Sequence, residues 1–237
     1  MPEFAYMRRA LSPERLGPIR DALLGSSFVS QSTLGGAFEK SHGFAMTFQR
    51  EGRDQIEQRF PPLKDYFAQV LGEPAVRALQ SWWGRYRKQP IVVPNAWYMN
   101  LLLVSEGGTV GRHIDTTLSR EAGVPGTTPV AVTVLYLKVP QASGGELEIS
   151  REGLVKGVIK PHEGGLLHFC GELAHEILPV QAVPDGAQRA SLVIEQYHFA
   201  DEALARLPKF KLDSRAGFKA FLEHHAERDP KPFELED

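Results

Sequence analysis

The stretch from about residue 91 to residue 199 most constrains the fold, because it consists of short apolar runs separated by Gly, Pro, Ser and Asp. The runs are WYMNLLLV, VAVTVLYLKV, GELEIS, GVIKP, GGLLHFC, EILPV and RASLVIEQYHF. Runs of this length that are rich in Val, Ile, Leu and Tyr are typical of β-strands. Many short strands at this spacing predict an antiparallel sandwich or barrel.

Helical patterns flank these strands. Residues 12–25 begin with Ser-Pro and carry apolar residues at helical spacing, which predicts a helix. Residues 62–80 predict two more helical pieces with a break between them, and the pattern is helical again after Phe199. We expect a single domain over residues 1–237, divided into mostly helical support (1–90), a strand core (91–200) and a helical segment (201–237).

Charge and cysteine usage narrow the class of protein. The formal net charge is −2 and the basic residues are scattered, so we expect neither a nucleic acid nor a membrane as partner. One cysteine, Cys170, excludes an internal disulfide and a Cys-rich zinc site. The first residues lack the apolar region of a signal peptide, and no stretch approaches the roughly 20 apolar residues of a membrane span. These features predict a cytoplasmic protein, and they leave its oligomeric state open.

The segment GRHIDTTL places His113 and Asp115 two positions apart. In a strand both side chains would point to the same face, and two histidines with one carboxylate form a facial ligand set that suits iron(II). We expect the second histidine to come from far along the chain, and His175, at the start of a predicted strand, is the best candidate. The other histidines are His42, His162, His168, His198, His224 and His225. Of these, we interpret His168 as packed within a strand. We expect His224 and His225 to be solvated on a helical tail.

Arg189 opens the apolar run RASLVIEQYHF and is the one Lys or Arg between residues 161 and 204. An arginine at a strand start inside a barrel needs a carboxylate partner, and no acidic residue is placed by sequence to supply one. A dicarboxylate co-substrate would serve, because the guanidinium binds a carboxylate through two hydrogen bonds.

Over roughly residues 96–205 the chain resembles the iron(II)- and 2-oxoglutarate-dependent dioxygenases, specifically the prolyl 4-hydroxylase-like branch. The resemblance is carried by GGTVGRHID, VAVTVLYLK, SGGELEIS, IKPHEGGLLHFCGELAHEILPV and RASLVIEQYHF, which follow in that order. It implies a mainly β fold with flanking helices, built on a double-stranded β-helix (jelly roll) core. The first 90 residues carry no part of the resemblance.

Carried over to this chain, the resemblance implies that His113, Asp115 and His175 bind iron(II). It further implies that Arg189 and Tyr136 hold the distal carboxylate of 2-oxoglutarate, with O2 as the second co-substrate. The implied reaction is hydroxylation of an unactivated C–H bond of a small molecule, an amino acid or a peptidyl residue, with release of succinate and CO2.

Other interpretations remain open on the sequence alone. The same scaffold can catalyse desaturation or ring formation, or serve as a metal-binding jelly roll without turnover. A zinc hydrolase would need a general base, and Glu176 should point away from His175 by the two-residue period of a strand. Asp115 argues against a halogenase, in which a small residue replaces the carboxylate, and Glu195 stands where nucleic-acid demethylases have a second arginine. The aromatic cluster of Trp82, Trp83, Tyr86 and Trp97 could line a substrate entrance or simply pack.

Overall fold

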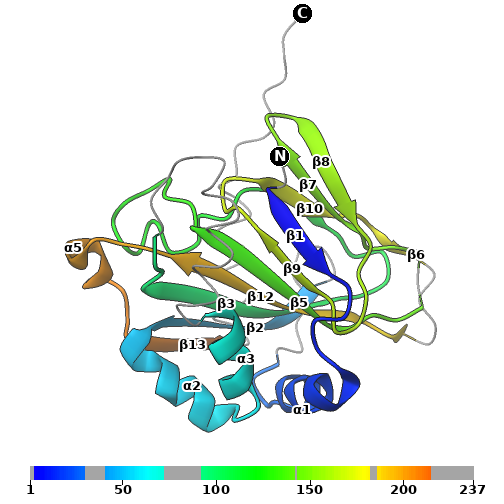
Figure 1. Cartoon of the computed structure of the whole chain (residues 1–237), viewed down its shortest axis with the longest axis horizontal. Coiled ribbons are helices and arrows are strands. Elements are labelled where there is room, and N and C mark those ends of the chain that lie inside the picture. Colours follow the sequence, from blue (N-terminus) through cyan, green and yellow to red (C-terminus); the bar gives the residue numbers. More distant parts are fainter. Residues whose placement is uncertain (1–2, 30–40, 72–91, 142, 182–185, 215–237) are drawn as a thin grey trace, which may run out of the picture.

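Two antiparallel sheets face each other in the computed structural model, which describes residues 3–29, 41–71, 92–141, 143–181 and 186–214 (Figure 1). The larger sheet has seven strands in the order β1 (Phe4–Met7), β9 (Leu166–Phe169), β5 (Ala131–Lys138), β12 (Arg189–Tyr197), β3 (Ala96–Val104), β2 (Ser41–Gln49) and β13 (Phe210–Ser214). The smaller sheet has four strands in the order β4 (Val110–His113), β10 (Ala174–Ile177), β7 (Leu147–Arg151) and β8 (Leu154–Ile159). A two-stranded sheet pairs β11 (Val180–Gln181) with β6 (Ser143–Gly144).

β12 is the central strand of the larger sheet. It reads RASLVIEQY, is buried along almost its whole length, and pairs with β3 on one side and β5 on the other. Its side chains alternate between the two faces of the sheet, so Arg189, Ser191, Glu195 and Tyr197 share one face. That face lies toward the smaller sheet, because a single apolar cluster joins Val132 and Val134 of the larger sheet to Leu147 and Ile149 of the smaller one.

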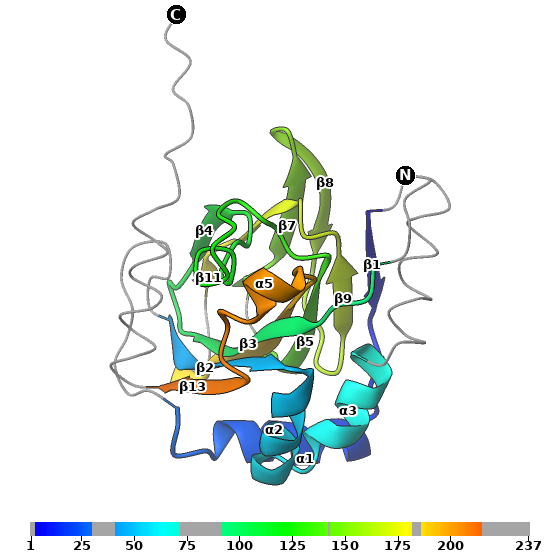
Figure 2. The ribbon, with the colours of Figure 1, turned by 90° about the vertical axis from the view of Figure 1, so that its left-hand side faces the viewer.

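Helices cover the opposite face of the larger sheet (Figure 2). They are α1 (Pro13–Leu24), α2 (Arg53–Arg59) and α3 (Leu63–Val70), with a 3₁₀ turn (Arg50–Gly52) before α2. In α1 the buried residues Leu16, Ile19 and Leu23 recur at three- and four-residue spacing, as expected of a helix that packs one side on a sheet. A short helix, α5 (Asp201–Leu204), follows β12.

The jelly-roll core with flanking helices agrees with the fold class expected from the sequence. The helix expected at residues 12–25 is α1, and the first piece expected in 62–80 is α3. Strands β1, β2 and β13 were not anticipated, although they extend the larger sheet at both edges. The second helical piece of 62–80 lies outside the described residues, as do residues 215–237. Within the segment expected to be helical from residue 201, a helix covers only Asp201–Leu204, and Phe210–Ser214 form β13 instead because they pair with β2.

β2 was missed because it lacks the alternation that marks a half-exposed strand. Its sequence SHGFAMTFQ is buried on both faces, between the helices on one side and the inter-sheet region on the other. A strand covered on both faces has no polar side to reveal its two-residue period. Among the described residues no helix is both long enough and apolar enough to cross a membrane.

Candidate metal centre and carboxylate pocket

His113, Asp115 and His175 lie together at one place between the two sheets. His113 ends β4, Asp115 lies two residues further on, and His175 belongs to β10. β4 and β10 are antiparallel neighbours in which His113 and His175 are cross-strand partners. One ligand atom from each of the three residues lies within 4.8 Å of the others. The pairing of two short strands thus assembles a set of two histidines and one carboxylate.

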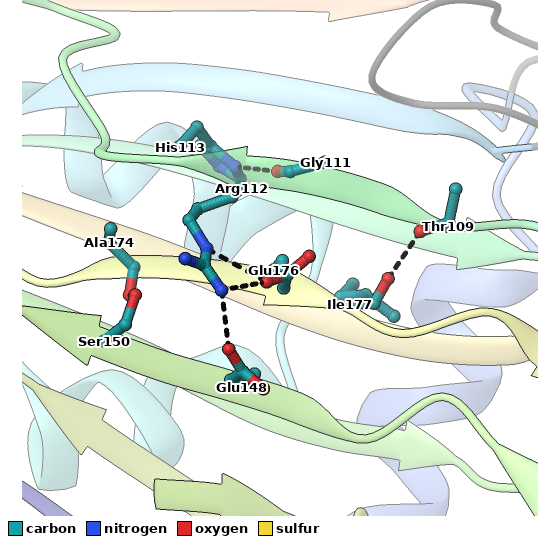
Figure 3. Close-up of polar contacts among 9 residues, drawn as sticks. All are labelled: Thr109, Gly111, Arg112, His113, Glu148, Ser150, Ala174, Glu176 and Ile177. Atoms are coloured by element: carbon teal, nitrogen blue, oxygen red, sulfur yellow. Dashed lines mark hydrogen bonds and ion pairs between the residues drawn. The ribbon is translucent and has the colours of Figure 1, made fainter. Parts of the chain in front are cut away.

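The Nε2 atoms of both histidines face Asp115. His113 Nε2 lies 3.4 Å from Asp115 Oδ1, and His175 Nε2 lies 3.6 Å from Asp115 Oδ2. The Nδ1 atoms lie next to backbone carbonyls, at 2.7 Å from Gly111 O (Figure 3) and 3.3 Å from Leu173 O. A hydrogen on each Nδ1 can be donated to its carbonyl, which leaves the Nε2 lone pairs available to a metal ion.

Burial keeps the imidazole of His175 neutral. It lowers the pKa of His175 to about 4, and the attraction of Asp115 offsets this only in part. The ring of Phe169 packs against His175 at 4.9 Å between centroids and contributes to that burial. Metal ions bind the neutral form of histidine, so the site is ready for a metal at neutral pH.

Arg189 lies on the same inner face of the larger sheet. Only 2% of it is exposed, and its Nη1 donates to the carbonyl of Gly145 at 2.6 Å. Its Nε and Nη2 have no hydrogen-bond partner within the described residues. Burial lowers the pKa of Arg189, while nearby Tyr136 and Glu146 act in the opposite direction. An arginine remains protonated in proteins, so this is a buried cation with donors to spare.

Two neighbouring hydroxyl groups also lack hydrogen-bond partners among the described residues. Ser191 and Tyr136 are cross-strand partners on β12 and β5, and Ser191 Oγ and the Tyr136 hydroxyl are both buried without a hydrogen bond to the described residues. The ring of Tyr136 lies 5.1 Å from Arg189 Cζ, and burial raises the pKa of its hydroxyl to about 12. Buried polar groups are normally paired, so this group of donors fits a bound anion such as a carboxylate.

A cavity of about 500 Å³ opens beside Arg189. Its lining includes Gly144, Gly145, Lys160 and Val180. Gly144 and Gly145 both have positive φ, and a Cβ on Gly144 would lie 2.0 Å from the carbonyl oxygen of Pro179. This turn therefore requires glycine, and it brings the Gly145 carbonyl to the guanidinium of Arg189.

Glu176 points away from the metal centre, as its position next to His175 predicted. Its carboxylate accepts from Arg112 at 2.7 Å, and Arg112 also donates to Glu148 at 2.7 Å (Figure 3). This exposed cluster spans β4, β10 and β7 on the outer face of the smaller sheet. Glu176 is therefore not placed to act as a general base at the metal centre.

The remaining candidates are distributed over the molecule. His168 is buried on β9 with its Nδ1 2.8 Å from the Thr133 hydroxyl, as expected of a packed histidine. Trp97 is buried in the cluster beneath the larger sheet, stacked on Phe48 at 5.3 Å. The other residues proposed for a substrate entrance, Trp82, Trp83 and Tyr86, lie outside the described residues, as do His224 and His225.

Sequence reasoning missed a second polar group on the inner face of β12, formed by Glu195 and Tyr197. The Tyr197 hydroxyl donates to Glu195 at 2.5 Å, and the Thr117 hydroxyl donates to the same carboxyl at 2.8 Å. A signal was present, because Glu195 stands an even number of positions after Arg189 and so shares its face. Two charged residues on one inner face of an apolar strand are unusual.

Comparison with known proteins supports the fold. No family model and no curated protein matches this sequence. Among solved structures, a prolyl hydroxylase from Trichoplax adhaerens, in complex with a hypoxia inducible factor oxygen degradation domain peptide fragment, aligns with a TM-score of 0.55. It is 16% identical over 86% of this chain and 87% of that chain.

A second similar structure is an oxidoreductase of the 2OG-Fe(II) oxygenase family from Burkholderia pseudomallei. It aligns with a TM-score of 0.56 and 17% identity, over 85% of this chain and 88% of that chain. The chain therefore has the fold of the 2-oxoglutarate- and iron(II)-dependent oxygenases, as the resemblance of its motifs implied.

Proposed function

We propose that this protein is a non-haem iron(II)- and 2-oxoglutarate-dependent oxygenase that hydroxylates an unactivated C–H bond. The observation that carries the proposal is the pairing of a two-histidine, one-carboxylate centre with a buried arginine whose Nε and Nη2 have no hydrogen-bond partner among the described residues, both between the same two sheets. A metal-binding module without turnover would have no use for such an arginine. The same inner surface thus offers a place for a cation and a place for a dicarboxylate.

The residues fit the groups they would hold. His113, Asp115 and His175 would bind iron(II), since neutral imidazoles and one carboxylate form the facial set that leaves coordination positions open. Arg189 and Tyr136 would hold the distal carboxylate of 2-oxoglutarate, because their unpaired donors are buried side by side.

When bound, iron(II), 2-oxoglutarate and O2 supply the oxidising chemistry, in which the co-substrate becomes succinate and CO2 and one oxygen atom enters the substrate C–H bond. The protein contributes orientation and exclusion of water. Arg189 anchors the co-substrate at one end, and the backbone carbonyls at Gly111 and Leu173 fix the rings of the two histidines. Buried apolar residues between the sheets, Leu102, Val104 and Ile177 among them, keep this region dry.

We propose a small molecule, an amino acid or a peptidyl residue as the substrate. The Trichoplax adhaerens neighbour is solved with a peptide fragment, which supports a peptide among the candidates. Glu195 argues against a nucleic acid, because it stands where the nucleic-acid demethylases have a second arginine. We further propose a cytoplasmic location, since a chain with one cysteine, Cys170, cannot form an internal disulfide.

The test is anaerobic addition of iron(II) and 2-oxoglutarate to the metal-free protein, with visible absorption as the readout. The chelated 2-oxo acid should give a charge-transfer band. We expect the band to vanish in His113→Ala. In Arg189→Ala we expect the band to require at least about tenfold more 2-oxoglutarate, which corresponds to a loss of about 1.4 kcal/mol in binding free energy. Arg20→Ala is the matched control, because Arg20 pairs with Asp21 and Glu163 on the surface.

Absence of the band in the wild-type protein, despite metal binding, would refute the oxygenase and favour a metal-binding module. Where the band is present, release of succinate in the presence of O2 and candidate substrates would identify the substrate class. Analysis of the product by mass would separate hydroxylation, which adds one oxygen atom, from desaturation or ring formation, which removes two hydrogen atoms.

A further inference from the structure

Glu195 is a buried carboxyl that the proposed reaction does not use. It lies on the inner face of β12, its exposed fraction is 2%, and its cross-strand partner on β3 is Tyr98. Burial raises the pKa of Glu195 well above its usual range, and the negative charge of nearby Asp115 adds to this effect. Burying a carboxyl close to a second carboxyl costs stability, so its retention calls for an explanation.

Two hydroxyl groups donate hydrogen bonds to the carboxyl group of Glu195. Thr117 donates through its hydroxyl at 2.8 Å. Tyr197 donates its hydroxyl at 2.5 Å, and Tyr197 belongs to the same apolar cluster as Leu118. Glu195 is thus linked to two consecutive residues of the segment that follows Asp115, to Thr117 directly and to Leu118 through Tyr197.

This segment is a compact turn that does not belong to any strand. β4 ends at His113, and beyond it Ser119 donates to the carbonyl of Thr116 through both its backbone N–H, at 3.1 Å, and its hydroxyl, at 2.7 Å. Leu118 is fully buried in an apolar cluster that includes Tyr197. The position of Asp115 therefore depends on how this turn is attached to the larger sheet, and Glu195 provides the polar part of that attachment.

We propose that Glu195 is a positioning residue that holds Asp115 in place for metal binding by tying Thr117 and, through Tyr197, Leu118 to β12. The inference rests on the metal centre of the proposed function. Contacts that orient a metal ligand commonly change metal affinity by about 10- to 100-fold when removed. Each carboxyl oxygen of Glu195 accepts a hydroxyl hydrogen, whereas a Gln would present its NH2 group to Thr117 or to Tyr197 in place of one acceptor.

The test measures the affinity of the metal-free protein for Zn(II), by competition with a chromophoric chelator. Zn(II) is used because two histidines alone still bind it measurably. We expect Glu195→Gln to bind Zn(II) about 10- to 100-fold more weakly than wild type. Thr117→Val, which removes one hydroxyl donor and keeps every charge, should show a smaller loss in the same direction.

Two further variants separate positioning from the mere presence of a carboxyl group and from general stability. Glu195→Asp keeps the carboxyl group but shortens the side chain by one methylene, so positioning predicts a loss close to that of Glu195→Gln. In an Asp115→Ala background, Glu195→Gln should change Zn(II) affinity less than threefold, because its effect passes through Asp115. Such a comparison isolates the coupling between the two residues. Thermal unfolding in excess chelator reports any loss of stability separately.

Three results would overturn the positioning role. These are wild-type Zn(II) affinity in Glu195→Gln, wild-type affinity in Glu195→Asp, or an equal loss from Glu195→Gln with and without Asp115. The second would assign the effect to the carboxyl group rather than to its position, and the third would show that the effect does not pass through Asp115. If the wild-type protein itself bound no Zn(II), or bound it equally well after Asp115→Ala, the metal centre would fail and the positioning role with it.

Discussion

His113 and His175 face each other across β4 and β10 as direct cross-strand partners, with ring centroids 4.3 Å apart. Their geometry depends on strand register, because a shift of one residue would turn His175 to the outer face and bring Glu176 inward. On the outer face, Arg112 links Glu176 and Glu148 of the two neighbouring strands and so favours the observed register. The metal centre is thus held by interactions on both faces of the smaller sheet.

His175 and Glu176 are adjacent on β10, and we expect only the replacement of His175 to impair metal binding. We expect His175→Ala to weaken iron(II) binding by more than about 100-fold, because it removes a ligand rather than a group that orients one. Glu176→Ala, which loses only an ion pair that is partly exposed, should change it little. Anaerobic titration with iron(II) checks both, and equal losses in the two variants would contradict the assignment of faces.

Arg189→Lys should weaken 2-oxoglutarate binding although the charge is kept. A lysine cannot form the paired hydrogen bonds of a guanidinium, and the Gly145 carbonyl would lose its donor. We expect an increase in the dissociation constant of about tenfold, or about 1.4 kcal/mol. The measurement is titration of the charge-transfer band with 2-oxoglutarate. Unchanged affinity in Arg189→Lys would show that charge alone is recognised.

Gly145→Ala should damage both stability and the carboxylate pocket. Gly145 has φ of +70°, and an added Cβ would lie 3.1 Å from Val180 Cγ2 and 3.8 Å from Arg189 Nη1. The positive φ alone costs about 1 kcal/mol or more for a non-glycine residue. Gly153→Ala is the control, because its φ is +75° and nothing lies within 4 Å. Denaturant unfolding should show a loss in both variants, whereas weaker 2-oxoglutarate binding should appear only in Gly145→Ala.

His168 should make the protein sensitive to acid. Burial lowers its pKa from 6.5 to about 4, so between these values the unfolded chain binds a proton that the folded protein does not. The contribution of neutral His168 to the free energy of unfolding is therefore present above pH 6.5. It falls by about 3 kcal/mol as the pH drops from 6.5 to 4. His168→Gln should show a smaller loss over that interval than wild type in denaturant unfolding. Replacement of the exposed His198 by Gln is the control, and an identical pH dependence in His168→Gln would disprove the effect.

The chemistry of the candidate site could be predicted from the sequence because it is carried by residue types at fixed spacing. His113 and Asp115 two positions apart, a histidine at a later strand start, and an arginine opening an apolar strand each indicate a role without reference to the rest of the chain. The core strands were equally visible, because their runs of β-branched and aromatic residues are bounded by turn residues. These patterns correspond to strands in the structure because they depend only on the residues within each strand.

Tertiary structure decided which strands meet and in what register. The pairing of β4 with β10 joins residues far apart in the sequence, and no local pattern specifies that His113 should face His175 rather than a neighbour. β2 could not be predicted because a strand covered on both faces shows no alternation, and β1 and β13 are short, partly exposed strands at the two edges of the larger sheet. The contact between Glu195 and Thr117 arises only when the turn after β4 packs on β12. Sequence determined the chemical groups, and long-range packing determined their distances.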